Sequence, residues 1–221
     1  MTQHEHYALS FSGGKDSMLA LDRAVRSGLH VEYLVTLFDE ASQRVRFHGV
    51  PIALIQAQAD ALGITLLPYP TRPETFESAF LQSLSDLRQR GVTGIIFGNI
   101  HLSDVRAWYE ERTTAAGLTH VEPLWGDAPT DLVRECIARG YQATLTCIEV
   151  ARAKAAWLGA TLTEQLVQEF ERSGIDPCGE RGEYHTFVSN GPLFARPVAI
   201  RTGAIVTMPG FQLIDILLEG A

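Results

Sequence analysis

The chain has 221 residues, of which 46% are hydrophobic and 20% are charged, as in an ordinary globular protein. This length can bury a substantial core without metals or disulfides, and no apolar stretch approaches the roughly 20 residues that a membrane span requires. The formal net charge of −8, with lysine only at Lys15 and Lys154 and no run of basic residues, argues against nucleic acid as a partner, because phosphate contacts need a basic surface.

The amino terminus lacks the Lys or Arg of a secretory signal and leads directly into a predicted strand at residues 7–11. Ser12-Gly13-Gly14-Lys15-Asp16-Ser17 follows at once, and then an apolar helical stretch at residues 18–25. Strand, glycine turn and helix build a phosphate cradle, because the glycines allow a tight turn and the amides that open the helix point at an anion. The spacing is not that of a Walker A loop or of a dinucleotide fingerprint.

The side chains of this loop fit a phosphate ligand that carries a metal ion. Lys15 adds a positive charge, and Ser12 and Ser17 add hydroxyl donors. Asp16 is unusual, because a carboxylate beside phosphates makes sense mainly when a metal ion lies between them. The alternative is a simple strand-to-helix turn in which Asp16 or Ser17 caps the helix.

Strand and helix patterns then alternate as far as residue 123. Strands are predicted at 31–38, 64–69, 94–98 and 119–122, and helices at 51–62, 75–90 and 105–116. With the first strand and helix, this alternation of five strands with four helices predicts an α/β fold with an open, doubly wound parallel sheet.

Ligands of such sheets bind beyond the carboxyl ends of the strands, so residues 12–17, 39–48 and 98–101 are expected to meet at one site. Gly98 and Asn99 are therefore candidate nucleotide contacts. His48 either contacts a ligand or is an ordinary loop histidine.

From about residue 124 the regular alternation ends. Helical segments are predicted at 130–139 (with Thr130 or Asp131 as cap), 153–157 and 163–172, and strands at 142–150, 198–202 and 211–218. This mixture indicates a smaller α+β lobe packed against the first part. We therefore expect a nucleotide-binding domain at residues 1–123 and a substrate-binding lobe at residues 124–221.

A second polar segment lies in this lobe, at residues 176–187, just before an apolar strand start. Around two turn glycines it carries three carboxylates, one histidine and one threonine: Asp176, Glu180, Glu183, His185 and Thr186. Beside a nucleotide site, such a segment holds a metal, binds a cationic substrate or positions an ammonia nucleophile. The alternative, which composition leaves open, is a solvated loop.

The cysteines and tryptophans carry weaker indications. Cys136, Cys147 and Cys178 are widely spaced and form no C-x-x-C pair, which indicates reduced thiols of a cytoplasmic protein. A thiol role for Cys178 is disfavoured, because it has no obvious partner cysteine. One of three tryptophans is expected to line the ligand cleft: Trp108, Trp125 or Trp157.

Two motifs resemble those of a known family. Residues 12–17 match the pyrophosphate-binding loop of N-type ATP pyrophosphatases, and residues 176–194 closely resemble the C-terminal signature of diphthine–ammonia ligase. That signature reads here Gly179-Glu180-Arg181-Gly182-Glu183-Tyr184-His185-Thr186-Phe187, followed by Gly191-Pro192-Leu193-Phe194. Similar pieces at 97–100, 106–111, 123–125 and 157–159 extend the resemblance over nearly the whole chain.

The resemblance implies an adenine nucleotide alpha hydrolase-like fold of the HUP type and an amidation driven by ATP. A substrate carboxylate attacks the α-phosphate, pyrophosphate leaves, and ammonia then displaces AMP from the acyl-adenylate. The implied ATP-binding residues are Ser12, Gly13, Gly14, Lys15, Asp16, Ser17, Gly98 and Asn99. The implied catalytic residues are Lys15, His185 and Asp16, which also holds Mg²⁺, and the implied substrate-binding residues are Glu180, Glu183, His185 and Thr186.

The resemblance also implies the partners. They are ammonia and a carboxylate on a small molecule or a protein side chain, with elongation factor 2 as acceptor where the source makes diphthamide. His185 is expected to deprotonate ammonium near neutral pH, and a homodimer is a further expectation. Two alternatives remain. One is a tRNA-modifying ATP pyrophosphatase of the thiolase or lysidine type, which would share only the loop, and the other is an ATP-binding sensor that retains the fold without turnover.

Overall fold

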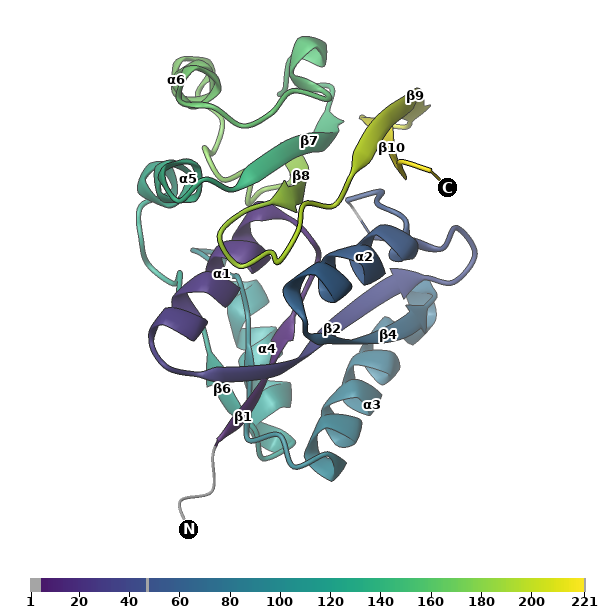
Figure 1. Cartoon of the computed structure of the whole chain (residues 1–221), viewed down its shortest axis with the longest axis vertical. Helices are drawn as coiled ribbons and strands as arrows, with labels where there is room; N and C mark the ends of the chain where they lie inside the picture. The colour runs from purple at the N-terminus through teal and green to yellow at the C-terminus, as the bar shows by residue number, and fades with distance from the viewer. Residues whose placement is uncertain (1–4, 47, 221) are drawn as a thin grey trace.

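The computed structural model describes residues 5–46 and 48–220. Met1 to His4, which contribute to the expectation that no secretory signal is present, lie outside the described residues, as do Phe47 and Ala221. The described chain forms two sheets with helices packed around them, and Figure 1 shows the second sheet above the amino-terminal part. Among the described residues, no helix has both the length and the apolar character needed to cross a bilayer.

The first sheet is built from the apolar runs of the amino-terminal part. Five strands run parallel in the order β4-β2-β1-β5-β6, and the two-residue β3 pairs antiparallel with the end of β2. The strands are β1 (His6–Ser10), β2 (His30–Asp39), β3 (Arg44–Val45), β4 (Thr65–Thr71), β5 (Gly94–Ile96) and β6 (Thr119–Val121). The predicted parallel sheet is confirmed; β3 is too short to give a sequence pattern.

Helices cover both faces of this sheet, so the predicted doubly wound arrangement is confirmed. They are α1 (Lys15–Arg26), α2 (Ile52–Leu62), α3 (Phe76–Gln89), preceded by the short turn η1 (Pro73–Thr75), and α4 (Ser103–Ala115). Buried residues of α1 and α2 form one hydrophobic cluster with the second lobe, whereas α3 packs in a separate cluster on the other face. Gly63 ends α2 in the left-handed conformation (φ 68°), as its sequence position predicts.

The second sheet is wholly antiparallel, in the order β8-β7-β10-β9. Its strands are β7 (Gln142–Glu149), β8 (Tyr184–Asn190), β9 (Ile200–Met208) and β10 (Phe211–Leu218), and the helical segments beside it are α5 (Pro129–Ala138), η2 (Ala155–Trp157) and α6 (Glu164–Ser173). The lobe is therefore α+β, as predicted. The prediction that Thr130 or Asp131 caps α5 is wrong, because the helix starts at Pro129 and Ala128 is its N-cap.

The two sheets meet at the glycine turn that precedes α1. The Val188 amide of β8 donates to the Gly13 carbonyl (2.9 Å), and the Gln58 side chain of α2 donates to the same carbonyl (2.9 Å) and to Val188 O (2.6 Å). Strand order in the first sheet reverses between β1 and β5, where ligands of open parallel sheets bind. The start of β8 thus lies beside this switch point.

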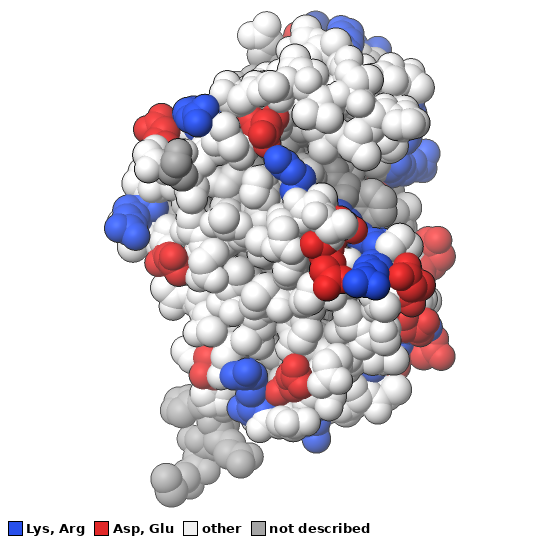
Figure 2. Space-filling model, turned by 90° about the vertical axis from the view of Figure 1, so that its right-hand side faces the viewer, with Lys and Arg blue, Asp and Glu red and all other residues white. Residues whose placement is uncertain are grey.

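Charged residues interleave on the surface. On the face shown in Figure 2, acidic and basic side chains lie next to one another and no extended basic area is present. This face therefore offers no continuous cationic surface for a nucleic-acid backbone.

Candidate active site

The glycine turn opens α1 without a side-chain cap. Gly13 adopts φ +79°, which favours glycine, and Gly14 is the N-cap residue with no side-chain cap hydrogen bond. A Cβ atom on Gly14 would lie 2.8 Å from Cε1 of His48, so a side chain there would collide with the loop that follows β2. The alternative in which Asp16 or Ser17 caps the helix is wrong. Oγ1 of Thr186 accepts the Lys15 amide, which leaves the amides of Asp16 and Ser17 in the first turn to face a ligand.

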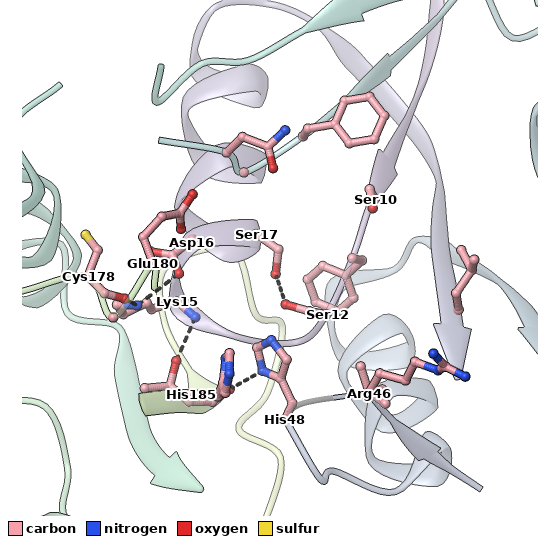
Figure 3. Close-up of a pocket in the computed structure, with 18 of the residues that line it drawn as sticks. Ser10, Ser12, Lys15, Asp16, Ser17, Arg46, His48, Cys178, Glu180 and His185 are labelled. Carbon is pink, nitrogen blue, oxygen red and sulfur yellow. Dashed lines mark hydrogen bonds and ion pairs between the residues drawn. The ribbon is translucent and has the colours of Figure 1, made fainter. Parts of the chain in front are cut away.

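A cavity of about 280 Å³ opens where this turn, the loops after β2 and β5, and the start of β8 converge. Figure 3 shows Lys15, Asp16, Glu180 and Cys178 at one end of the cavity and Arg46 at the other. Its polar lining consists of Ser10, Ser12, Lys15, Asp16, Ser17, Arg46, His48, Asn99, Glu180, His185 and Thr186. Its apolar and aromatic lining includes Val35, Leu37, Phe76, Phe80, Phe97 and Tyr109.

Lys15 is the buried cation of this cavity, with 3% of its side chain exposed. Its Nζ donates to Oδ2 of Asp16 (2.9 Å) and to the Cys178 carbonyl, and it lies 4.7 Å from the centre of the Tyr184 ring. Burial alone would lower the pKa of the ammonium, but the Asp16 carboxylate and the electron-rich groups around it outweigh burial and raise the pKa well above its usual value. Lys15 therefore stays protonated at neutral pH.

Two carboxylates stand beside this lysine. Burial raises the pKa of Asp16, although Lys15 opposes the shift, and 28% of the Asp16 side chain remains exposed. Burial, and then the charge of Asp16, raise the pKa of Glu180 to about 7. Oε1 of Glu180 accepts the Ile100 amide (3.2 Å). This end of the cavity thus carries excess negative charge, for which a cation is the complementary ligand.

Two histidines, His48 and His185, line the cavity. Nδ1 of His48 donates to the carbonyl of Thr186 (3.1 Å), and the rings of His48 and His185 lie 4.7 Å apart. Burial lowers the pKa of His48 to about 4, and burial together with His48 and Lys15 lowers the pKa of His185 well below its usual value. The expectation that His185 changes protonation near neutral pH is therefore wrong, because both rings stay neutral there.

The second motif anchors the turn as well as lining the cavity. Thr186, which is 1% exposed, accepts the Lys15 amide on its Oγ1 (3.0 Å). Glu183 is 2% exposed and is absent from the residues that line the cavity; it pairs with Nη1 of Arg152 (2.9 Å) and accepts the Arg181 amide (3.1 Å). Glu183 thus braces the loop that presents Glu180.

The described lining differs from expectation in its aromatic residues, whereas its thiols behave as expected. No tryptophan belongs to it; Trp108, for example, packs on Phe80 at 5.3 Å. Cys178 lines the cavity, but its thiol is buried, donates to Pro129 O (3.2 Å) and has a pKa raised by burial, which makes it a poor nucleophile. Cys136, Cys147 and Cys178 are all free and buried.

Two features of the site were not predicted from the sequence: Arg46 lines the cavity, and Asn99 is oriented by a neighbouring carboxylate. Arg46 belongs to the predicted 39–48 loop, where its charge was the available signal. The Asn99 amide nitrogen donates to Oε1 of Glu122 (2.7 Å). The other oxygen of Glu122, Oε2, lies 3.1 Å from Nε of Arg106. Because a carboxylate accepts but does not donate, this contact fixes which side of the Asn99 amide carries the carbonyl oxygen.

Comparison with known proteins covers both parts of the chain. Residues 5–120 match the diphthamide synthase N-terminal domain, and residues 128–215 match the diphthamide synthase C-terminal domain. The diphthine–ammonia ligase of Rattus norvegicus is 26% identical over 226 residues, covering 90% of this chain and 84% of the relative, and that of Bos taurus is 27% identical over 227 residues with the same coverage. A solved structure described as a predicted subunit of tRNA methyltransferase from Methanocaldococcus jannaschii shares 16% identity, with a TM-score of 0.47 over 83% of this chain and 96% of that one.

Proposed function

The chain belongs to the diphthamide synthase family, and on that premise we propose that it is an ATP-dependent, AMP-forming ligase that amidates a substrate carboxylate with ammonia. One observation carries the proposal: the glycine turn at the start of α1 and the second motif on β8 open into the same cavity. A nucleotide and an acceptor can therefore be held within reach of each other in a single site.

The lining of the cavity favours one orientation of ATP, with the phosphates at one end and the base at the other. Its phosphates would lie on the first-turn amides of α1, near Lys15 and the hydroxyls of Ser12 and Ser17, which are 3.3 Å apart. Its base would lie among the aromatic side chains at the other end, with Gly98 and Asn99 beside it. A Cβ on Gly98 would come within 3.0 Å of the backbone of Asp16, so only glycine allows β5 to approach the turn this closely.

The residues present also fit Mg²⁺. Asp16 would hold the ion, because its carboxylate is partly exposed at the negatively charged end of the cavity. Among the described residues this end holds no group of three ligand atoms within 4.8 Å of one another, so phosphate oxygens and water would complete the set. Mg²⁺ bound there would neutralise charge on the phosphates.

In the first half-reaction the acceptor carboxylate attacks the α-phosphorus, and pyrophosphate leaves with the bonding electrons. Lys15 would stabilise the charge that develops on this leaving group, because its ammonium is buried, protonated and already oriented by Asp16 and the Cys178 carbonyl. Such fixed donors need no rearrangement during the reaction.

In the second half-reaction ammonia attacks the acyl carbon and AMP leaves. We assign the proton acceptor to Glu180, because a pKa of about 7 places its carboxylate near the ionisation midpoint at neutral pH. Its Oε1 is occupied by the Ile100 amide, so Oε2 would take the proton from ammonium. His185, as a neutral ring, would orient the acyl-adenylate by hydrogen bonding, and Thr186 would hold the turn in place.

Several finer assignments belong to the same proposal. The acceptor would be diphthine on elongation factor 2 where the source makes it, and the carboxylates near Lys15 suit its trimethylammonium group. We also propose the division into residues 1–123 and 124–221, a cytoplasmic location consistent with three free cysteines, and a homodimer. The tRNA thiolase alternative is disfavoured, since Cys178 has no cysteine partner among the described residues.

The test is to supply purified protein with Mg²⁺-ATP, ¹⁵N-ammonium and diphthine-bearing elongation factor 2. The proposal predicts AMP and pyrophosphate as products and ¹⁵N in the acceptor. ADP and phosphate would refute the pyrophosphatase chemistry, and tight ATP binding without turnover would favour the sensor.

A further inference from the structure

A cluster of histidine and carboxylate side chains lies away from the cavity, at the amino ends of β1 and β2. His6 is the first residue of β1 and His30 the first residue of β2, and the two are paired directly across the parallel ladder. Glu32 stands two residues after His30, at the point where the β1–β2 register shifts between Tyr7 and Ala8, and its carboxylate lies beside His6. Because the cavity lies beyond the carboxyl ends of these strands, the cluster occupies the opposite edge of the sheet.

The atoms of these three side chains that could bind a metal lie close together. All lie within 4.8 Å of one another, and no other group of three His, Cys, Asp or Glu side chains among the described residues meets this limit. Nδ1 of His6 is 2.9 Å from Oε2 of Glu32, and the rings of His6 and His30 are 5.4 Å apart, edge to face. Oε1 of Glu32 accepts the Tyr33 hydroxyl (3.2 Å), which fixes the carboxylate with its other oxygen toward His6.

The contact between His6 and Glu32 is close without being a well-formed hydrogen bond. Nδ1 of His6 is shielded from solvent and has no hydrogen-bond partner of acceptable geometry among the described residues, although the carboxylate oxygen is near. A nitrogen and an oxygen that bind one metal at about 2.1 Å lie about 3 Å apart when the bond angle is near 90°. The observed 2.9 Å separation would let both atoms bind one ion with little movement.

We propose that His6, His30 and Glu32 form a binding site for a divalent transition-metal ion, of which Zn²⁺ and Ni²⁺ are examples. Two imidazoles and one carboxylate form a donor set that suits Zn²⁺, Ni²⁺ and Cu²⁺, whereas Mg²⁺ and Ca²⁺ prefer oxygen ligands. His6 and Glu32 each keep 40% of the side chain exposed, so water can complete the coordination. The ion would join β1 to β2 through side chains. This site is independent of the proposed ligase activity.

The experiment uses the untagged full-length protein, stripped with a chelator, without nucleotide. Zn²⁺ is titrated calorimetrically, and the nitrogen couplings of bound Cu²⁺ are recorded by electron paramagnetic resonance. The wild type is expected to bind one ion at this site, with Cu²⁺ tighter than Ni²⁺. H30A and E32Q are expected to weaken Zn²⁺ binding at least tenfold and to change the Cu²⁺ spectrum, while E111Q, which alters a carboxylate that is 78% exposed, is the matched control.

Circular dichroism of the metal-free variants separates loss of the site from loss of the fold. His30 is exposed, so H30A removes no buried packing, and E32Q keeps the side-chain shape if H30A proves unstable. Wild-type protein that binds no Zn²⁺, or variants that bind it with unchanged affinity and spectrum, would overturn the proposal.

Discussion

Replacing Glu180 with glutamine tests the assignment of the proton acceptor. The substitution keeps the shape of the side chain and the acceptor for the Ile100 amide, but it removes a carboxylate whose pKa of about 7 follows from burial and the nearby Asp16 charge. At pH 6 about one tenth of such a group is ionised, and at pH 8 about nine tenths. A positioned proton acceptor typically contributes about 10²–10⁴-fold to a rate.

The assay follows amide formation with ammonium between pH 6 and 8, and hydroxamate formation with hydroxylamine in parallel. Hydroxylamine is largely unprotonated at neutral pH and needs no base to release its lone pair. We expect E180Q to lose at least about 100-fold of the ammonium-dependent rate at pH 8, and to lose much less with hydroxylamine. The wild-type rate should rise as Glu180 ionises and level off above pH 7, whereas the variant rate should follow the fraction of free ammonia and keep rising, so the ratio of wild-type to variant rates should fall as pH rises. Equal losses with both nucleophiles, or a ratio independent of pH, would refute the reasoning and leave Glu180 a structural residue.

Three further substitutions test other parts of the site. K15M should lower pyrophosphate release at least about 100-fold, the usual cost of losing a transition-state charge donor, while K154M, at the other and largely exposed lysine, should leave it unchanged. G98A should weaken ATP binding measured by calorimetry, because its Cβ would press on the Asp16 backbone from 3.0 Å; unchanged affinity would contradict the close packing. For His48, the folded-state pKa of about 4 lies below the unfolded value of 6.5, so the unfolded chain binds more protons between these values. Stability should therefore fall as pH falls through this window, and the contribution lost by pH 5 is about 2 kcal/mol. Urea unfolding at both ends of the window should show H48N losing less stability than the wild type, and an equal loss would contradict the buried neutral ring.

The frame of the fold could be predicted from local patterns. The apolar run that became β2 and the glycine that ends α2 each reflect short-range physics, since burial and backbone freedom act within a few residues. The β9 strand shows the limit: only residues 198–202 had a strand pattern, whereas Ile200–Met208 is extended because β10 pairs with it after the turn at Gly210. Pairing with the next strand thus extends β9 beyond the residues that carry a strand pattern of their own.

The sequence predicted which segments form the site better than it predicted the role of each residue in it. The loops after β1, β2 and β5 converge because strand ends meet at one edge of a parallel sheet, and β8 of the second sheet joins them at the glycine turn. Glu183 could not be told from Glu180 by residue type. Only the tertiary structure pairs Glu183 with Arg152 and leaves Glu180 facing the cavity. The neutrality of His185 likewise depends on burial and on His48 from another loop, neither of which the motif contains.

The central claim is that one cavity cleaves ATP between the α and β phosphates and delivers the activated carboxylate to ammonia. The most direct measurement is a single-turnover reaction with [α-³²P]ATP, ¹⁵N-ammonium and diphthine-bearing elongation factor 2, in which nucleotide products and acceptor mass are read from the same sample. Labelled AMP and ¹⁵N-amide are expected in equal amounts. Labelled ADP, or AMP formed without any amide, would contradict it.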